Sequence, residues 1–260
     1  GDTRVVKFER HGNQVFLKHI NLEYRALSDN PLERLAVEEA FAESILWGFP
    51  IEAEDNDRLL VNATGFLLSD AHGISRTLAD LDQGNYSVDT SRSAIYLPRT
   101  RNFPLNSEFE ALLTFTTSGA GGNLVRSVTP TPQSITVRLH HSFVQLPDDN
   151  YQPRRFHPQS GYFSRSFDDY ATPINQDITQ RYIARHRLQK RDPDAPRSPP
   201  VEPIIYYLDA GVPEPVRSAL LDGARWWNDA FEAIGFENGF QVEILPEGAD
   251  PMDIRYNVIQ

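Results

Sequence analysis

The spacing of apolar positions along this chain predicts strands through most of its length. Residues 5–10 and 14–24 alternate or run apolar on either side of His11-Gly12-Asn13, which predicts a β-hairpin. Residues 36–51 begin with helix-forming side chains, but the alternation of large apolar residues from Ile45 to Ile51 favours a strand there. Shorter apolar runs predict further strands at 59–61, 86–97, 109–117 and 134–146.

The N-terminal part contains one predicted helix, over residues 65–81. Its leucines and Ile74 recur at helical spacing, and Asn62 or Thr64 can cap its first turn. The sequence Ser-Gly-Ala-Gly-Gly-Asn at 118–123 predicts a hairpin tip. It lacks the Gly-Lys-Ser/Thr ending of a phosphate-binding loop, and no helical pattern follows it.

The spacing of apolar and polar residues changes after Pro203. Residues 204–208 form a short apolar, β-branched and aromatic run, which predicts a buried strand. Pro213 and Glu214 suit the first turn of a helix, and Gly235 suits the position just past its end. Between them, apolar or small residues recur at helical spacing and predict one face that packs on a sheet: Val216, Leu220, Gly223, Trp226, Ala230 and Ile234.

Two more strands are predicted after this helix, at 241–245 and 253–259. Strand, helix and strand at this spacing predict a right-handed crossover in a partly parallel sheet. Trp226 and Trp227 are interpreted as core residues rather than as a platform for carbohydrate, since burying such rings stabilises a fold by a few kcal/mol.

A proline-rich stretch at 191–203 separates the two patterns. Such a stretch is typical of a semi-rigid linker. The predicted fold class is therefore α+β, with a β-rich N-terminal domain at 1–190, the linker at 191–203, and a second domain at 204–260 that opens with a β-α-β-β layer.

Residues 200–260, from Pro-Val-Glu-Pro-Ile-Ile-Tyr-Tyr-Leu-Asp-Ala-Gly to Asp-Ile-Arg-Tyr-Asn-Val-Ile-Gln, carry a resemblance. They resemble the opening of the catalytic domain in a family of large bacterial zinc-dependent metallopeptidases of metzincin type. Residues 1–190 are similar to the non-catalytic region that precedes the peptidase in that family. The family's zinc motif, His-Glu-x-x-His with a third histidine, is absent here, and the resemblance implies that it lies downstream of Gln260.

The resemblance implies a function for the intact protein, which is hydrolysis of peptide bonds with zinc as cofactor. The chain itself would be an inactive scaffold without a catalytic or metal-binding residue. Its partners would be the remainder of its own catalytic domain and, in the intact protein, a peptide or protein substrate. An extracellular, periplasmic or envelope location follows from the same resemblance. The alternatives are a β-rich module that binds protein or glycan, and a pro-region that assists folding.

The composition of the chain argues against several classes of partner and site. The net charge of −11 disfavours nucleic acid, because phosphate binding needs a cationic surface. No apolar run is long enough for a membrane span, and the absence of cysteine excludes disulfides and thiolate metal sites. If the second domain holds an incomplete sheet, exposed apolar surface is expected to promote self-association.

The most unusual segment of the N-terminal part is 154–163, Arg-Arg-Phe-His-Pro-Gln-Ser-Gly-Tyr-Phe. It resembles an Arg-x-x-Asp-Pro-x-x-Gly-Tyr-Phe pattern of the same family, with histidine in place of aspartate. Its arginines could hold the loop to acidic groups by bidentate bonds. The hypothesis is a loop at the domain junction or the cleft rim, and its candidate residues are Arg154, Arg155, His157, Gly161 and Tyr162.

The seven histidines give no metal-binding pattern, since none forms a His-x-x-x-His pair. His140 and His141 are adjacent in a predicted strand, so they should point to opposite faces. His157 could meet one of them in space, although nothing in the sequence requires it. The interpretation is that these histidines lie at the surface or are held by hydrogen bonds.

Overall fold

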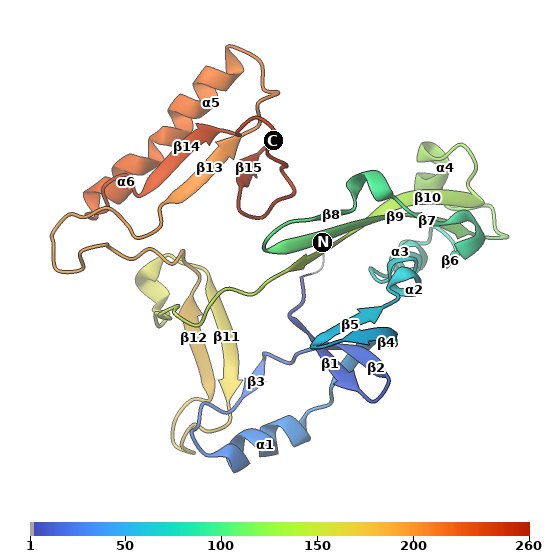
Figure 1. Ribbon diagram of the computed structural model, residues 1–260, viewed down its shortest axis with the longest axis horizontal. Coiled ribbons are helices and arrows are strands. Elements are labelled where there is room, and N and C mark those ends of the chain that lie inside the picture. The colour runs from blue at the N-terminus through green and yellow to red at the C-terminus, as the bar shows by residue number, and fades with distance from the viewer. Residues whose placement is uncertain (1–2) are drawn as a thin grey trace. The chain divides into compact units, whose positions relative to one another are not determined.

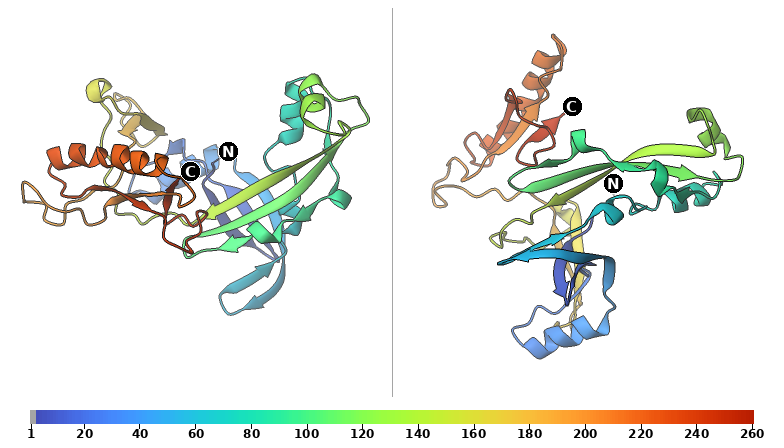
Figure 2. Two further views of the ribbon diagram at one scale, coloured as in Figure 1. Left: turned by 90° about the horizontal axis from the view of Figure 1, so that it is seen from above. Right: turned by 45° about the vertical axis from the view of Figure 1, so that its right-hand side comes forward.

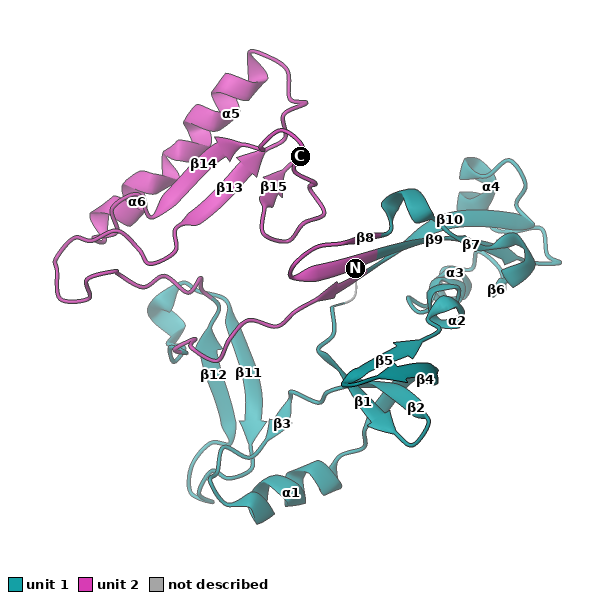
Figure 3. Ribbon diagram, in the orientation of Figure 1, with its two compact units in different colours: residues 1–100, 109–141, 153–184 teal, residues 101–108, 142–152, 185–260 magenta. Residues whose placement is uncertain are grey.

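The computed structural model describes residues 3–260 and has a mixed α+β fold with more strand than helix. The chain divides into two compact units (Figure 3). The first contains the described residues up to Thr100, together with 109–141 and 153–184. The second contains 101–108, 142–152 and 185–260.

The first unit begins with the predicted hairpin, formed by β1 (Val6–His11) and β2 (Gln14–His19). Gly12 in the turn has φ +60, which only a residue without a side chain adopts readily. A long strand, β4 (Ser44–Asp55), pairs with β2, and β5 (Arg58–Val61) completes this antiparallel sheet. The strand favoured at 45–51 is thus confirmed, whereas the helix formers before it belong to α1 (Pro31–Ala40).

A second sheet of the first unit has the order β12–β11–β3 (Figure 1). Strands β11 (Ser164–Asp169) and β12 (Thr179–Ile183) are antiparallel, and β3 (Tyr24–Arg25) pairs with β11 in parallel. The carboxylate of Asp169 is buried and accepts hydrogen bonds from the backbone of Leu27 (2.9 Å) and Ala171 (3.1 Å). This carboxylate therefore fixes the chain after β3 to the end of β11.

An apolar core lies on a third sheet, most of which belongs to the first unit. Its two long strands, β9 (Asn106–Thr116) and β10 (Ser134–Val144), are flanked on the other edge of β9 by three short strands. Those are β6 (Ser87–Val88), β7 (Ala94–Ile95) and β8 (Arg101–Asn102). Two short 3-10 turns, η1 (Thr90–Arg92) and η2 (Leu97–Arg99), lie between them. The core consists of Tyr86, Ala111, Leu113, Phe115, Val125 and Leu139.

The helix predicted over 65–81 is wrong as a single element. Two short helices form instead, α2 (Thr64–Leu67) and α3 (Ile74–Asp80). Gly73 between them has φ +67, and the Asp70 carboxylate accepts hydrogen bonds from the first backbone amides of α3, including that of Ile74 at 2.7 Å. The first amides of a helix have no acceptor within that helix, and the Asp70 carboxylate supplies one to α3. The chain therefore starts a second helix at Ile74 instead of continuing the first.

The stretch 118–123 also differs from expectation, because a helix does follow it. Helix α4 (Asn123–Val128) starts at the end of the glycine run and buries Val125 in the core. Six residues were too few for a periodic signal. The side chain of Gln83 accepts hydrogen bonds from the backbone of Leu124 (2.9 Å) and Val125 (3.3 Å), so the start of α4 is satisfied within the protein.

The second unit contains the C-terminal sheet, with the order β14–β13–β15. Strands β13 (Ile204–Leu208), β14 (Phe240–Ile244) and β15 (Asn257–Ile259) are all parallel to one another. The predicted strand–helix–strand unit is confirmed, and the strand expected at 253–259 is shorter.

The residues 191–203 pack into this unit, because Ser198 and Pro200 are buried and the backbone amide of Ser198 donates to Gly235 O (3.1 Å).

The helix between β13 and β14 runs along one face of these two strands (Figure 2). It is divided at Trp226 into α5 (Val216–Arg225) and α6 (Trp227–Ala233), and the Glu214 carboxylate caps it through Ser218 N (3.2 Å). The predicted packing face is wrong, since the stripe from Val216 to Ile234 is largely exposed. Trp226 and Trp227 are 76% and 64% exposed, so they are not core residues.

The helix packs instead through the adjacent stripe, about a quarter turn away. Leu221, Ala224, Asn228 and Phe231 are the half-buried side chains of that stripe. The ring of Phe231 stacks on Phe240 of β14 at 5.8 Å, and Asn228 accepts a hydrogen bond from the backbone of Phe240 (3.2 Å). These contacts orient the helix so that the more apolar stripe, from Val216 to Ile234, faces away from the sheet.

Candidate functional site

The predicted loop at 154–163 lies against β12 in the first unit. Phe156 N donates to Arg181 O (2.9 Å), and Ile183 N donates to Arg154 O (2.9 Å). These two bonds surround a bridge between Arg155 and Tyr182, in which the two side chains share a face and approach closely. The loop therefore starts as a short additional strand on β12.

The expectation that the two arginines anchor this loop is wrong. Neither the Arg154 nor the Arg155 guanidinium makes a hydrogen bond or an ion pair with any described residue, and both side chains are exposed. The backbone bonds to β12 hold the segment in place without them. Both arginines are therefore available to groups outside the chain.

The other three candidate residues shape the end of the loop. His157 caps a 3-10 turn, η3 (Pro158–Ser160), because its Nδ1 accepts a hydrogen bond from Gln159 N (3.2 Å). Gly161 has φ +70, which ends that turn and explains the need for glycine. Tyr162 is half-exposed and makes no hydrogen bond with a described residue. His157 is thus a structural residue, and it does not join His140 or His141.

One face of the β12–β11–β3 sheet gathers arginines and aromatic rings. Arg155 and Arg165 are both register partners of Tyr182, one on each side of it. Phe167 stacks on Tyr182 at 6.0 Å, and the Arg25 guanidinium lies 4.2 Å from the Phe167 ring centre. We call this surface the arginine–aromatic face, and it comprises Arg25, Arg155, Phe163, Arg165, Phe167 and Tyr182.

Of these residues only Arg155 was a candidate from the sequence. The alternation of Phe163, Arg165 and Phe167 was a usable signal, since every second residue of a strand points to the same side. The partner residues Arg155 and Tyr182 could be found only from the strand register.

A family profile described as "Domain of unknown function (DUF5117)" matches residues 1–191, which is well over half of the chain. The chain belongs to the DUF5117 family. The match ends beside the proline-rich stretch at 191–203 and includes the whole arginine–aromatic face. Comparison with curated proteins and with solved structures found no match to this chain.

The DUF5117 region also contains a cavity of about 460 Å³ beside α1. The stacked rings of Tyr24 and Phe41, 4.1 Å apart, form part of its wall. Lys18 lies in the cavity wall, and its Nζ contacts the carboxylates of Glu9 (2.9 Å) and Glu43 (2.8 Å). The hydrogen bonds that Lys18 donates to Glu43 and Glu9 raise the pKa of Lys18, and hydrogen bonds from Lys18 and Lys7 lower the pKa of the Glu9 carboxyl. The charge of Lys18 is thus paired with the carboxylates of Glu9 and Glu43.

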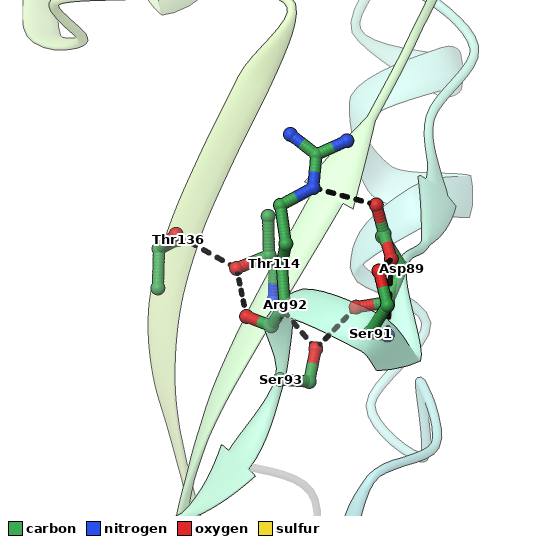
Figure 4. A network of polar contacts seen from close by, with 6 residues as sticks. All are labelled: Asp89, Ser91, Arg92, Ser93, Thr114 and Thr136. Carbon is green, nitrogen blue, oxygen red and sulfur yellow. Dashed lines mark hydrogen bonds and ion pairs between the residues drawn. The ribbon is translucent and has the colours of Figure 1, made fainter.

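The face of β9 and β10 that points away from the core is polar. Glu110 is buried and lies 3.0 Å from Arg99, with Arg138 and His140 each 3.6 Å away. Further along β9, the Thr114 hydroxyl donates to Arg92 O (2.6 Å) and meets the Thr136 hydroxyl at 2.9 Å (Figure 4). Cross-strand pairs of this kind stabilise the sheet.

The adjacent histidines point to opposite faces, as predicted. His140 faces Glu110, whereas His141 is buried on the core side, with its ring 5.2 Å from both Phe66 and His72. Burial lowers the pKa of His141 to about 4, helped by the charges of His72 and His140. Within residues 3–260 no three His, Cys, Asp or Glu side chains are grouped so that they could hold a metal ion, and no helix there is long and apolar enough to cross a membrane.

Proposed function

We propose that this chain is the non-catalytic N-terminal region of a zinc-dependent metallopeptidase of metzincin type, followed by the first layer of its catalytic domain. The observation that carries the proposal is the parallel sheet β14–β13–β15, in which α5 and α6 connect β13 to β14. This is the opening expected at the residues that resemble the peptidase. The exposed stripe of α5 and α6 gives further support, because a larger domain would cover it.

In this proposal the chain's own residues act as scaffold. Strands β13 and β14 hold one part of a sheet in register, and α5 and α6 lie across it through Phe231 and Asn228. In the intact protein, zinc would polarise the peptide carbonyl and activate water. No residue of this chain is assigned to zinc, since the motif belongs to a later part of the peptidase sequence. A secreted or envelope location and a peptide or protein substrate are parts of the same proposal.

Zinc content and peptide hydrolysis test the proposal directly. The 260-residue chain should bind no stoichiometric zinc and cleave no labelled casein, whereas a longer protein from the same gene should do both. Replacing the glutamate of that protein's His-Glu-x-x-His motif by glutamine should remove hydrolysis and retain zinc. A parent gene without that motif, or zinc-dependent hydrolysis by the 260-residue chain alone, would refute the proposal.

A further inference from the structure

The arginine–aromatic face carries two arginines, Arg155 and Arg165, that pair with no acidic side chain among residues 3–260. Arg155 and Arg165 are register partners of Tyr182 from its two sides, Arg155 through an isolated bridge and Arg165 in β11. Neither guanidinium has a hydrogen-bond or ion-pair partner among the described residues, and both side chains are exposed. Two exposed guanidinium groups on one face of the sheet favour the approach of an anion.

A shortage of acidic residues does not explain the unpaired arginines. The chain has 36 acidic residues against 25 basic ones. Other arginines in it do take carboxylate partners, for example Arg10 with Glu54 at 2.8 Å and Arg99 with Glu110 at 3.0 Å. Arg155 and Arg165 have no such partner among the described residues, and neither do Arg154 and Arg181 on the opposite side of the sheet. Arg155 and Arg165 differ from that pair because they lie on the face of the stacked rings of Phe167 and Tyr182.

Aromatic rings complete this face. Phe163 lies two residues before Arg165 and shares its side of the strand, and its side chain is 91% exposed. The stacked rings of Phe167 and Tyr182 form a half-buried floor beside the arginines. Arginine and aromatic residues are the types most enriched at protein–protein interfaces and at their energetic centres.

We propose that the arginine–aromatic face binds an acidic segment of another polypeptide. Carboxylates of that segment would accept bidentate hydrogen bonds from Arg155 and Arg165, and an apolar side chain would cover Phe163. An acidic segment fits better than a nucleic acid, because the protein's charge of −11 repels a long polyanion more strongly than a few carboxylates, and a peptide also offers apolar side chains to Phe163.

A matched pair of double variants tests the proposal. Arg155→Ala with Arg165→Ala removes the two arginines of the face. Arg154→Ala with Arg181→Ala removes two exposed arginines from the 154–163 loop and from β12, and strand alternation places them on the opposite side of the sheet. Both pairs change the net charge equally, and circular dichroism and urea unfolding verify that each variant folds.

Fluorescence anisotropy would measure binding of a short labelled peptide built from Glu-Glu-Phe repeats. The same peptide with glutamine for glutamate, a phosphoserine peptide and single-stranded DNA are the comparison probes. The Arg155/Arg165 variant should bind the acidic peptide about tenfold more weakly or worse, whereas the Arg154/Arg181 variant should stay within about twofold. Equal losses in both variants, no binding of the acidic peptide, or tighter binding of the phosphoserine peptide or the DNA would each overturn the proposal.

Discussion

The core of the β9–β10 sheet and the helix on the C-terminal sheet differ sharply in how far their apolar side chains are buried. Leu113 and Phe115 of β9 have no exposed surface, whereas Trp226 and Trp227, at the junction of α5 and α6, are mostly exposed. Both segments have a regular apolar pattern in the sequence. The pattern therefore identifies which side chains can be buried, and the number of elements available to cover them decides which ones are.

The largest expected effect is on the stability of the fully buried core of the β9–β10 sheet. Leu113→Ala leaves a cavity among fully buried side chains and should lower the free energy of unfolding of the first unit by about 3–4 kcal/mol. Trp227→Ala removes a larger but exposed side chain and should change stability by only about 0.5 kcal/mol. Urea unfolding followed by circular dichroism measures both. Similar losses for the two variants would show that the helix stripe is covered in solution.

The second prediction concerns how the free energy of unfolding of the first unit depends on pH. His141 has a pKa of about 4 in the folded protein, below its ordinary value of 6.5, because it is buried beside Phe66 and His72. Between these two pH values the unfolded chain binds more protons than the folded one. Stability is therefore complete above the unfolded pKa and falls as pH decreases from 6.5 towards 4, by on the order of 2 kcal/mol.

Unfolding titrations at a series of pH values, with His141→Phe as the comparison, test this slope. The variant removes the titrating ring and should flatten the curve between pH 6.5 and 4. The carboxyls of Asp89 and Asp148, whose pKa values are lowered by hydrogen bonds from Ser91 and Asn150, lose their contribution only at lower pH. An unchanged slope in His141→Phe would mean that another group causes the acid sensitivity.

The two regions also show what a single sequence can and cannot predict. Strong alternation or clear turn signals predicted several elements correctly: the first hairpin, β4, β9, β10 and the parallel C-terminal unit. The break at Asp70-Gly73 and the six-residue helix α4 did not follow, because a side-chain cap and a short helix leave almost no periodic signal.

The candidate site was predictable to a smaller extent. The segment 154–163 was found by its composition, and His157 and Gly161 have local roles that the sequence can suggest. The association of Arg155 with Tyr182 and Arg165 depends on which strands pair, and no local pattern contains that information. The helix face was mistaken for a related reason, since Leu221 and Phe231 form a second apolar stripe beside the stronger one.

The smallest expected effect concerns the exposed stripe itself. Val216, Leu220, Trp227 and Ile234 lie within about 40° of one another around the helix, so together they form a continuous apolar strip. Exposed strips of this kind promote association, and we expect the chain to form a weak dimer through it. Trp227→Glu places a charge in the strip and should raise the dimer dissociation constant about tenfold, or about 1.4 kcal/mol.

Sedimentation over a range of protein concentrations measures that equilibrium. Val128→Glu is the matched control, because Val128 is 78% exposed and lies in the first unit, outside the strip. It adds the same charge and should leave the dissociation constant unchanged. If the unmodified chain stays monomeric at high concentration, exposure of the strip has no effect on association, and the contrast with the filled β9–β10 core then reflects only how tightly each region packs.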